Sequence, residues 1–212
     1  MDGNIKFAYM TLEEFKMQLL SVKVGRDFQA FCRQHLMHGT PHVFAGREND
    51  YFEFKRLICD QFSIAHPDVF IVGSGKLGFS PHKETEFSLD SDIDVAIVSK
   101  SLSENLEILG AEFEYARRNA EFSLRADQAQ NYNRYLRYRA IGWTRPDLIP
   151  QLSRQMKEFK ASWFDFFGSI SNGRSTVGDY KVSAGLFKSL GHLEKYTEDS
   201  IMKIQQNLKL GL

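Results

Sequence analysis

The sequence predicts an α+β fold, in which a small mixed β-sheet is flanked by N-terminal, central and C-terminal helices. Three short apolar runs bounded by Gly, Pro, Ser or Asp residues, at about 69–73, 93–98 and 179–187, are typical of strands. Longer stretches on both sides of these runs repeat apolar residues at helical spacing. No repeat, low-complexity tract or evident linker divides the chain, so we expect one domain over residues 1–212.

The N-terminal part, residues 1–66, is expected to be helical. Thr11 and Glu14 have the spacing of a capping box, which marks the start of a helix predicted over residues 11–36. A loop rich in His, Gly and Pro follows it, and a second helix is predicted over about 49–64.

The middle part, residues 67–100, holds the first two strands, joined by a long polar turn over 74–91. Residues 101–212 are expected to be helical around the third strand. The helices predicted there cover about 103–140 with one break, 151–167 and 190–209. Apolar residues on one side of the last helix indicate a core face or a dimer face, so a homo-oligomer stays open.

The composition is that of an ordinary soluble globular protein, with 42% hydrophobic and 25% charged residues. Lys and Arg balance Asp and Glu at 27 each, which argues against a long nucleic acid or an anionic membrane as partner. Residues 1–4 lack the basic start of a signal peptide and no apolar run has the length of a membrane span, so we expect a cytoplasmic protein. Cys32 and Cys59 are expected to be reduced core residues.

A Gly-Ser turn and an Asp-x-Asp pair carry the strongest functional signal. Gly73 and Ser74 follow the first predicted strand, and Asp92 and Asp94 open the second. Because side chains alternate along a strand, both carboxylates are expected to project from one face. Such a pair beside a turn with free backbone N–H groups suits a divalent metal that carries a triphosphate. The structural alternative is that these aspartates and Asp90 cap a helix or face solvent at the start of a strand.

Two other phosphate-binding motifs share part of their pattern with this turn. A Walker A loop needs a glycine five residues before the Gly-Lys pair and Ser or Thr after it, whereas Phe70 and Leu77 occupy those positions. Residues 73–78 fit the dinucleotide pattern G-x-G-x-x-G, but Pro81 interrupts the helix that must follow. A redox protein that binds a dinucleotide is therefore the weaker alternative.

Residues 73–74 and 92–94 together resemble the hG[GS]…Dh[DE]h signature of the DNA polymerase beta-like nucleotidyltransferase superfamily. The surrounding residues, 78–80 and 91–96, look like those of its small, stand-alone bacterial members. The resemblance covers residues 71–98 well and the rest of the chain only loosely. It implies a nucleotidyltransferase-like arrangement of the sheet. The sequence departs from the family in the loop between Ser74 and Asp92, which is longer than the family commonly has.

The resemblance also implies roles for individual residues. Asp92 and Asp94 would hold Mg²⁺ or Mn²⁺ and act in catalysis. The residues expected to bind the nucleotide are Gly73, Ser74, Lys76 and Ser91. The family carries a third catalytic carboxylate on a later strand, for which Asp179 is the first candidate and Asp147 a weaker one. For Lys76 a solvated turn position, and for Ser91 a turn cap, are equally good explanations.

The function that the resemblance implies is Mg²⁺-dependent transfer of a nucleoside monophosphate from an NTP, with ATP expected, to a protein or RNA acceptor. Small relatives often work in toxin–antitoxin or phage-defence settings, which implies a partner protein from a neighbouring gene. The alternative is a catalytically degenerate module that binds a nucleotide or a partner protein without chemistry. Its motivation is the lack of an evident third acid inside a strand.

Two further groups combine aromatic and basic residues. Tyr132, Tyr135 and Tyr138 recur at helical spacing among arginines, a pattern that fits nucleic-acid binding but is explained better as a packed helix face. Residues 143–147 contain a Trp and an Arg, and they either help to close the nucleotide pocket or form a structural turn.

Overall fold

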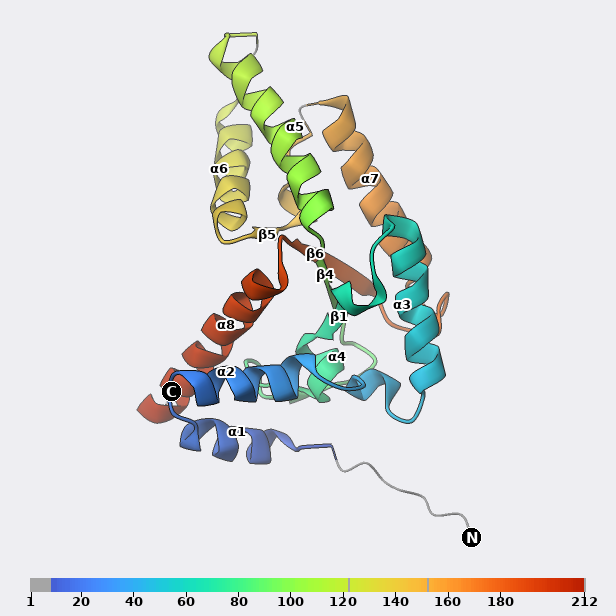
Figure 1. The fold of residues 1–212 in the computed structure, drawn as a ribbon, viewed down its shortest axis with the longest axis vertical. Coiled ribbons are helices and arrows are strands. Elements are labelled where there is room, and N and C mark those ends of the chain that lie inside the picture. Colours follow the sequence, from blue (N-terminus) through green and yellow to red (C-terminus); the bar gives the residue numbers. More distant parts are fainter. Residues whose placement is uncertain (1–8, 122, 152, 212) are drawn as a thin grey trace.

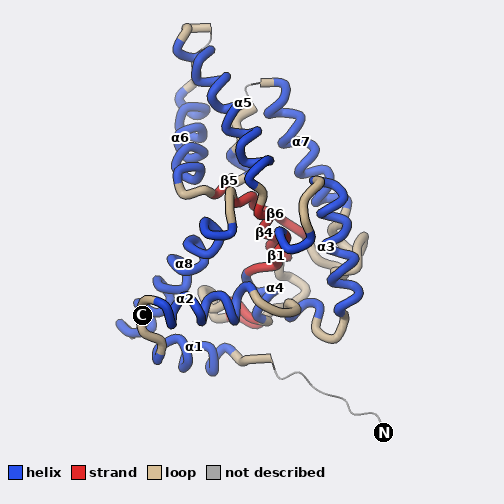
Figure 2. The backbone as a smooth tube through the Cα atoms, in the orientation of Figure 1, coloured by secondary structure: helices blue, strands red, loops and turns tan. Residues whose placement is uncertain are grey.

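The structure, a computed structural model, describes residues 9–121, 123–151 and 153–211. Residues 1–4, on which the expectation about a signal peptide rests, lie outside this part. The centre of the molecule is a small mixed sheet with helices on both faces (Figures 1 and 2). Its strands, in order across the sheet, are β1 (Val69–Val72), β4 (Ile93–Val98), β6 (Val182–Phe187) and β5 (Trp143–Thr144).

β4 is the strand that organises the sheet. It pairs antiparallel with β1 on one side and parallel with β6 on the other, and β5 adds antiparallel to the far edge of β6. The predicted α+β class with a small mixed sheet is confirmed, and the three longer strands lie where the apolar runs placed them. β5 was not predicted, because two residues are too few to show an alternating pattern.

The polar turn predicted over residues 74–91 contains regular structure. It holds most of a short helix, α4 (Gly73–Leu77), and a hairpin of β2 (Phe79–Ser80) and β3 (Thr85–Glu86). This hairpin extends the connection between β1 and β4, in agreement with the long loop that the sequence indicated.

The other α-helices of the described residues are α1 (Leu12–Ser21), α2 (Arg26–Cys32), α3 (Glu48–Phe62), α5 (Lys100–Arg118), α6 (Ala126–Ala140), α7 (Arg154–Ser169) and α8 (Leu190–Leu210). Shorter helical turns are the π-helical η1 (Arg33–Met37) and the 3-10 turns η2 (His42–Phe44), η3 (His66–Asp68) and η4 (Pro146–Leu148). The single helix predicted over 11–36 is wrong: it breaks where Val22 is extended and Gly25 takes a φ of +116°. The predicted break within 103–140 is confirmed between α5 and α6.

Side-chain caps define several helix starts. In the predicted capping box of α1, Thr11 N donates to Glu14 Oε2 at 2.8 Å and Glu14 N donates to Thr11 Oγ1 at 3.3 Å. Ser99, Ser153 and Ser189 accept a backbone N–H at the starts of α5, α7 and α8. Each such cap stabilises its helix by about 1 kcal/mol.

The two faces of the sheet have different roles. Ile93, Val95 and Ile97 of β4 point to one face, where they are buried in the main core against α3, α5 and α7. Burial of each such side chain contributes about 2 kcal/mol. Asp94 and Ala96 point to the opposite face, which α8 covers. The predicted alternation along this strand therefore sends Asp94 away from the main core.

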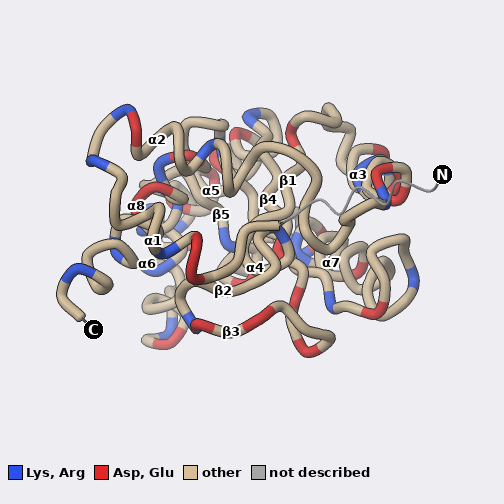
Figure 3. Tube along the Cα trace, turned by 90° about the horizontal axis from the view of Figure 1, so that it is seen from below, with Lys and Arg blue, Asp and Glu red and all other residues tan. Residues whose placement is uncertain are grey.

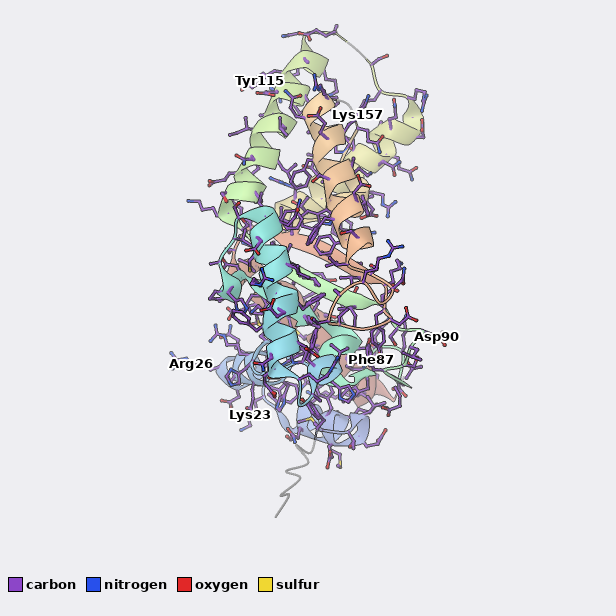
Figure 4. All side chains as sticks on the ribbon, turned by 90° about the vertical axis from the view of Figure 1, so that its right-hand side faces the viewer. Lys23, Arg26, Phe87, Asp90, Tyr115 and Lys157 are labelled. Carbon is purple, nitrogen blue, oxygen red and sulfur yellow. The ribbon has the colours of Figure 1, made fainter. Side chains whose placement is uncertain are left out.

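The helices extend the molecule in two directions from the sheet. The ends of α5, α6 and α7 form one pole, where Figure 4 labels Tyr115 and Lys157, and α1 and α2 lie at the other. Cys32 is buried and Cys59 partly buried, and both are free thiols as predicted. Within the described residues, none of the helices combines the length and apolar character that a bilayer crossing needs.

Candidate functional site

The Gly-Ser turn lies directly beside Asp94. β1 ends at Val72, which pairs with Asp94 in the antiparallel register, and Gly73 follows with a φ of +64°. A Cβ atom at position 73 would lie 3.3 Å from Asp94 Oδ2. Two features therefore favour glycine at this position, the left-handed backbone and the close approach of the carboxylate.

Ser183 of β6 holds the other side of Asp94. The parallel register places the two residues opposite one another, and Ser183 Oγ donates to Asp94 Oδ1 at 2.9 Å. The carboxylate is open to solvent, but the surrounding protein displaces much of its hydration shell, and this raises the pKa of Asp94. The Ser183 hydrogen bond opposes the shift, the charge of Asp92 adds to it, and the charges of two nearby lysines oppose it.

Asp92 lies one residue before β4 and has a different partner. Lys181 Nζ lies 3.2 Å from Asp92 Oδ2, and both side chains are about half exposed or more, at 67% for Lys181 and 47% for Asp92. An ion pair this exposed contributes less than about 1 kcal/mol, so a competing cation can displace Lys181. The charge of Asp92 adds to the raised pKa of Asp94, but the contact that the Asp92 carboxylate makes is the one with Lys181.

A pocket of about 840 Å³ opens in front of Asp94. This volume lies within the range of about 300–1,000 Å³ that small-molecule sites occupy. Gly73, Ser74 and Ser183 line it together with Asp94, whereas Asp92 is outside its lining. The polar groups that face it from α8 and from the segment after β5 are Tyr196, Thr197, Ser200, Arg145 and Asp147.

The pocket residues around β5 form an aromatic and cationic wall that the sequence singled out as 143–147. The ring of Trp143 lies 4.6 Å from that of Tyr196, measured between centroids. The Arg145 guanidinium lies 5.8 Å from the Trp143 ring and forms an ion pair with Asp147 at 2.7 Å. Of the two interpretations of this segment, the structure supports a place in the pocket wall.

Lys76 lies away from this pocket. Its side chain is buried, and Nζ donates to the backbone carbonyls of His38 and Gly39, the second at 3.0 Å. Burial lowers the pKa of Lys76 to about 8. The amine therefore fixes the loop after η1, and it is not placed to contact a phosphate in the pocket, nor is it a solvated turn residue.

Ser91 is placed as a turn cap. Its Oγ accepts a hydrogen bond from Ser88 N at 3.1 Å, and Ser91 is outside the pocket lining. The contact fits the structural alternative that the sequence left open.

The predicted third carboxylate is not found beside Asp94. Asp179 is exposed in the turn before β6, outside the pocket lining, and Asp147 is turned toward Arg145. The position opposite Asp94 belongs to Ser183. Across the described ranges, no group of three or more His, Cys, Asp or Glu side chains is arranged to hold a metal ion. The alternation of residues 181–184 puts Lys181 and Ser183 on one face of the predicted strand, but it does not indicate that Asp92 and Asp94 lie opposite them.

The oxygen donors at this site nevertheless have the chemistry that Mg²⁺ or Mn²⁺ prefers. Two carboxylates and one hydroxyl, from Asp92, Asp94 and Ser183, are hard ligands, and Mg²⁺ is usually bound by one or two carboxylates plus water and substrate phosphates. The residues present therefore fit a metal that arrives together with a triphosphate.

No protein-family model, curated protein or solved structure matches the chain. The resemblance to the nucleotidyltransferase superfamily stays a prediction from the sequence.

Proposed function

We propose that the protein is a divalent-metal-dependent nucleotidyltransferase that transfers a nucleoside monophosphate from an NTP, with ATP as the expected donor, to a protein or RNA hydroxyl. The observation that carries this proposal is the position of Asp94. It lies between the Gly73 backbone and the Ser183 hydroxyl and lines a pocket of about 840 Å³, large enough for a nucleotide. The arrangement of the Gly-Ser turn, α4 and the Asp-x-Asp strand around it is consistent with a nucleotidyltransferase-like core.

The proposed nucleotide has its phosphates at the Gly-Ser end of the pocket. Ser74 offers a hydroxyl and the turn offers backbone N–H groups, which are the donors that terminal phosphates accept. Trp143 and Tyr196 at the other wall offer ring faces on which a nucleobase can stack. Lys76 has no part in this placement, because its amine is engaged by two carbonyls.

Asp92 and Asp94 would hold the metal, which supplies charge neutralisation for the triphosphate when bound. The acceptor hydroxyl oxygen forms a bond to the α-phosphorus, and the bond from that phosphorus to the oxygen bridging to the β-phosphate breaks. Pyrophosphate leaves with the bonding electron pair. The hydroxyl proton passes to a carboxylate oxygen of the Asp92–Asp94 pair, of which Asp94 is the member that lines the pocket.

The test is transfer of label from α-³²P-NTPs in a cell lysate with Mg²⁺. Wild type is expected to label a protein or an RNA, and Asp94→Ala is expected to lose the signal by a factor of about 10³ or more, since it removes the metal ligand that faces the pocket. Asp179→Ala is the matched control, because Asp179 is exposed and outside the pocket, and it is expected to label as wild type does. Equal labelling by wild type and Asp94→Ala would contradict the proposal.

A second candidate is a nucleotide-binding module without transfer activity. Ser183 lies opposite Asp94, and Lys181 forms an ion pair with Asp92. Neither residue adds a third carboxylate to Asp92 and Asp94. This candidate predicts Mg²⁺-dependent ATP binding by calorimetry that Asp94→Ala weakens, with no label on protein or RNA. Binding of NAD without Mg²⁺ would instead support the dinucleotide alternative.

A further inference from the structure

The edge of β6 next to the pocket is only partly covered. Ile93 N donates to Lys181 O and Ser99 N donates to Phe187 O, so the odd-numbered residues of this strand direct their backbone groups toward β4. The even-numbered residues therefore direct theirs outward. β5 pairs with this outer edge only at Leu186 and Phe187, and its continuation is prevented by Pro146, which begins a 3-10 turn.

Two outward residues, Val182 and Ala184, lie beyond the reach of β5. Val182 N donates to the side chain of Ser171 at 2.8 Å. No strand of the described chain pairs with Ala184 on this side. The outer edge thus presents the N–H of Ala184 and the carbonyls of both residues to the pocket that residues 182–185 line, between Ser171 and the turn at Pro146–Leu148.

This open edge forms part of the pocket wall. Residues 182–185 all line the pocket that Asp94 faces, and α7 and α8 flank them on the two sides. The α7 side contributes apolar rings, among them Phe164, which is 48% exposed. Backbone pairing groups between apolar walls are the features with which proteins bind an extended peptide as an added strand.

We propose that the acceptor is a protein, and that an extended segment of it pairs with β6 at residues 182–184 as an added strand that continues the row of β5. This inference rests on the proposed transferase function. It names the class of acceptor, a peptide that presents a side-chain hydroxyl, and the surface that positions it.

The geometry of a sheet brings the acceptor hydroxyl to the correct face. A residue placed beside Ser183 in the added strand projects to the same face as Ser183 and Asp94, because neighbours across a sheet share a face. Its Cα atom lies two strand spacings from that of Asp94, or about 10 Å. A tyrosine side chain spans most of that distance, and a serine or threonine leaves room for the α-phosphate between its hydroxyl and Asp94.

The charges around the pocket favour a peptide over RNA. Two cations lie beside the edge, Lys181 in an exposed contact with Asp92 and Arg145 in an ion pair with Asp147, and two are few for binding an RNA backbone. RNA binding relies on cations that neutralise phosphates. In the view of Figure 3, the positions of Lys and Arg are interspersed with those of Asp and Glu along the trace.

The decisive variant is Ala184→Pro. Proline removes the outward N–H of Ala184, which lies between the N–H of Val182, bonded to Ser171, and the residues paired with β5. It leaves the hydrogen bonds to β4 in place, because those belong to Ser183 and Gly185. The probe is a pool of nine-residue peptides with Ser, Thr or Tyr at the centre and mixed residues around it, together with α-³²P-ATP and Mg²⁺. Labelling of the pool is expected to fall about tenfold in Ala184→Pro, since one hydrogen bond and the fit of the strand are lost. Ala184→Ser keeps the N–H and is expected to label as wild type does.

Two controls keep the result interpretable. ATP affinity and Tm are expected to match wild type in both variants, because neither change touches Asp94 or the ladder to β4. If the proline variant unfolds, amide hydrogen exchange of the wild-type protein tests the inference instead. The peptide pool is expected to slow exchange of the Ala184 amide. Exchange of the Gly185 amide is expected to stay unchanged, because that amide is already bonded within the sheet.

Each outcome separates the docking surface from the transferase function. Peptide labelling by Ala184→Pro at the wild-type rate, or unchanged exchange at Ala184, would overturn the added-strand inference. Labelling of RNA but not of peptide would overturn it and leave the transferase proposal intact. Protection of Ala184 without any ATP binding would support the docking surface and contradict the transferase proposal.

Discussion

Ser183 donates its hydroxyl to Asp94 Oδ1 at 2.9 Å across a parallel pair of strands. That register decides the chemistry of the site, because whichever residue lies opposite Asp94 is the one next to the expected metal. The same pairing of β4 with β6 brings Lys181 to Asp92. Ser183 of β6 and Lys181, the residue before this strand, therefore contribute a hydroxyl and an ammonium group beside the carboxylates of Asp94 and Asp92.

Replacing Ser183 with aspartate is expected to strengthen metal binding. Ser183→Asp adds a third carboxylate beside Asp94, and affinity for a hard divalent cation rises with the number of charged ligands. We expect Mg²⁺ to bind about tenfold more tightly in the presence of ATP. Calorimetric titration measures this, with Ser183→Asn as the uncharged control of similar size. Equal Mg²⁺ affinity of the Asp and Asn variants would show that position 183 does not face the metal.

The raised pKa of Asp94 predicts a pH-dependent effect of Asp94→Asn. In the folded state the carboxyl is protonated at a higher pH than in the unfolded state, so wild type loses stability as pH rises from the ordinary Asp pKa through the raised one. Asparagine has no charge to desolvate and keeps an oxygen for the Ser183 hydroxyl. Because solvent reaches this carboxylate, we expect Asp94→Asn to be only slightly more stable than wild type at pH 7, by about 2 °C in Tm. Thermal unfolding from pH 3 to pH 8 tests it, and a difference that persists unchanged at pH 3 would contradict the assignment.

Lys76 predicts a pH dependence in another range. Its pKa of about 8 lies below the ordinary lysine value of 10.5, so between these values the unfolded state binds more protons than the folded state. Wild type is therefore expected to gain stability relative to Lys76→Met as pH rises from 8 to 10.5. Urea unfolding at pH 7.5, 9 and 10 measures the free energy of unfolding of both proteins. The titration of other groups cancels in the difference between them. The affinity for ATP is expected to be the same in both, and a large loss in Lys76→Met would restore a phosphate-binding role.

Much of this site follows from the sequence, and the missing part has a physical reason. The strand at 93–98 and the alternation of Asp92 and Asp94 are local patterns, so they could be predicted from a few neighbouring residues. The partner of Asp94 could not, because it depends on the register of a strand about ninety positions away in the chain, which local periodicity does not specify.

Lys76 shows the same limit from another direction. In the sequence it is a polar residue in a glycine-rich turn, where exposure and phosphate contact are both reasonable expectations. Its burial depends on the carbonyls of His38 and Gly39, which the π-helical η1 and the following loop bring to α4. No pattern within residues 73–78 indicates that contact.

The close approach of Gly73 to Asp94 gives the last prediction. Gly73→Ala places a Cβ 3.3 Å from Asp94 Oδ2 on a backbone with a φ of +64°, and is expected to lower the free energy of unfolding by about 1–2 kcal/mol. Gly110→Ala is the matched control, because Gly110 lies within α5 with no atom within 4 Å of its Cβ position. That change is expected to raise the free energy of unfolding by about 0.5–1 kcal/mol, from helix propensity alone.

Nucleotide affinity distinguishes strain at Gly73 from a role in binding. The Cβ would shift either the turn or the carboxylate, and both contact the proposed triphosphate. We therefore expect Gly73→Ala to weaken Mg²⁺-dependent ATP binding about tenfold beyond any effect of stability, measured by calorimetry well below the Tm of the variant. Gly110→Ala is expected to bind ATP as wild type does. A Gly73→Ala protein that is destabilised yet binds ATP with unchanged affinity would place the phosphates elsewhere in the pocket, because a turn that grips them cannot move without weakening their hydrogen bonds.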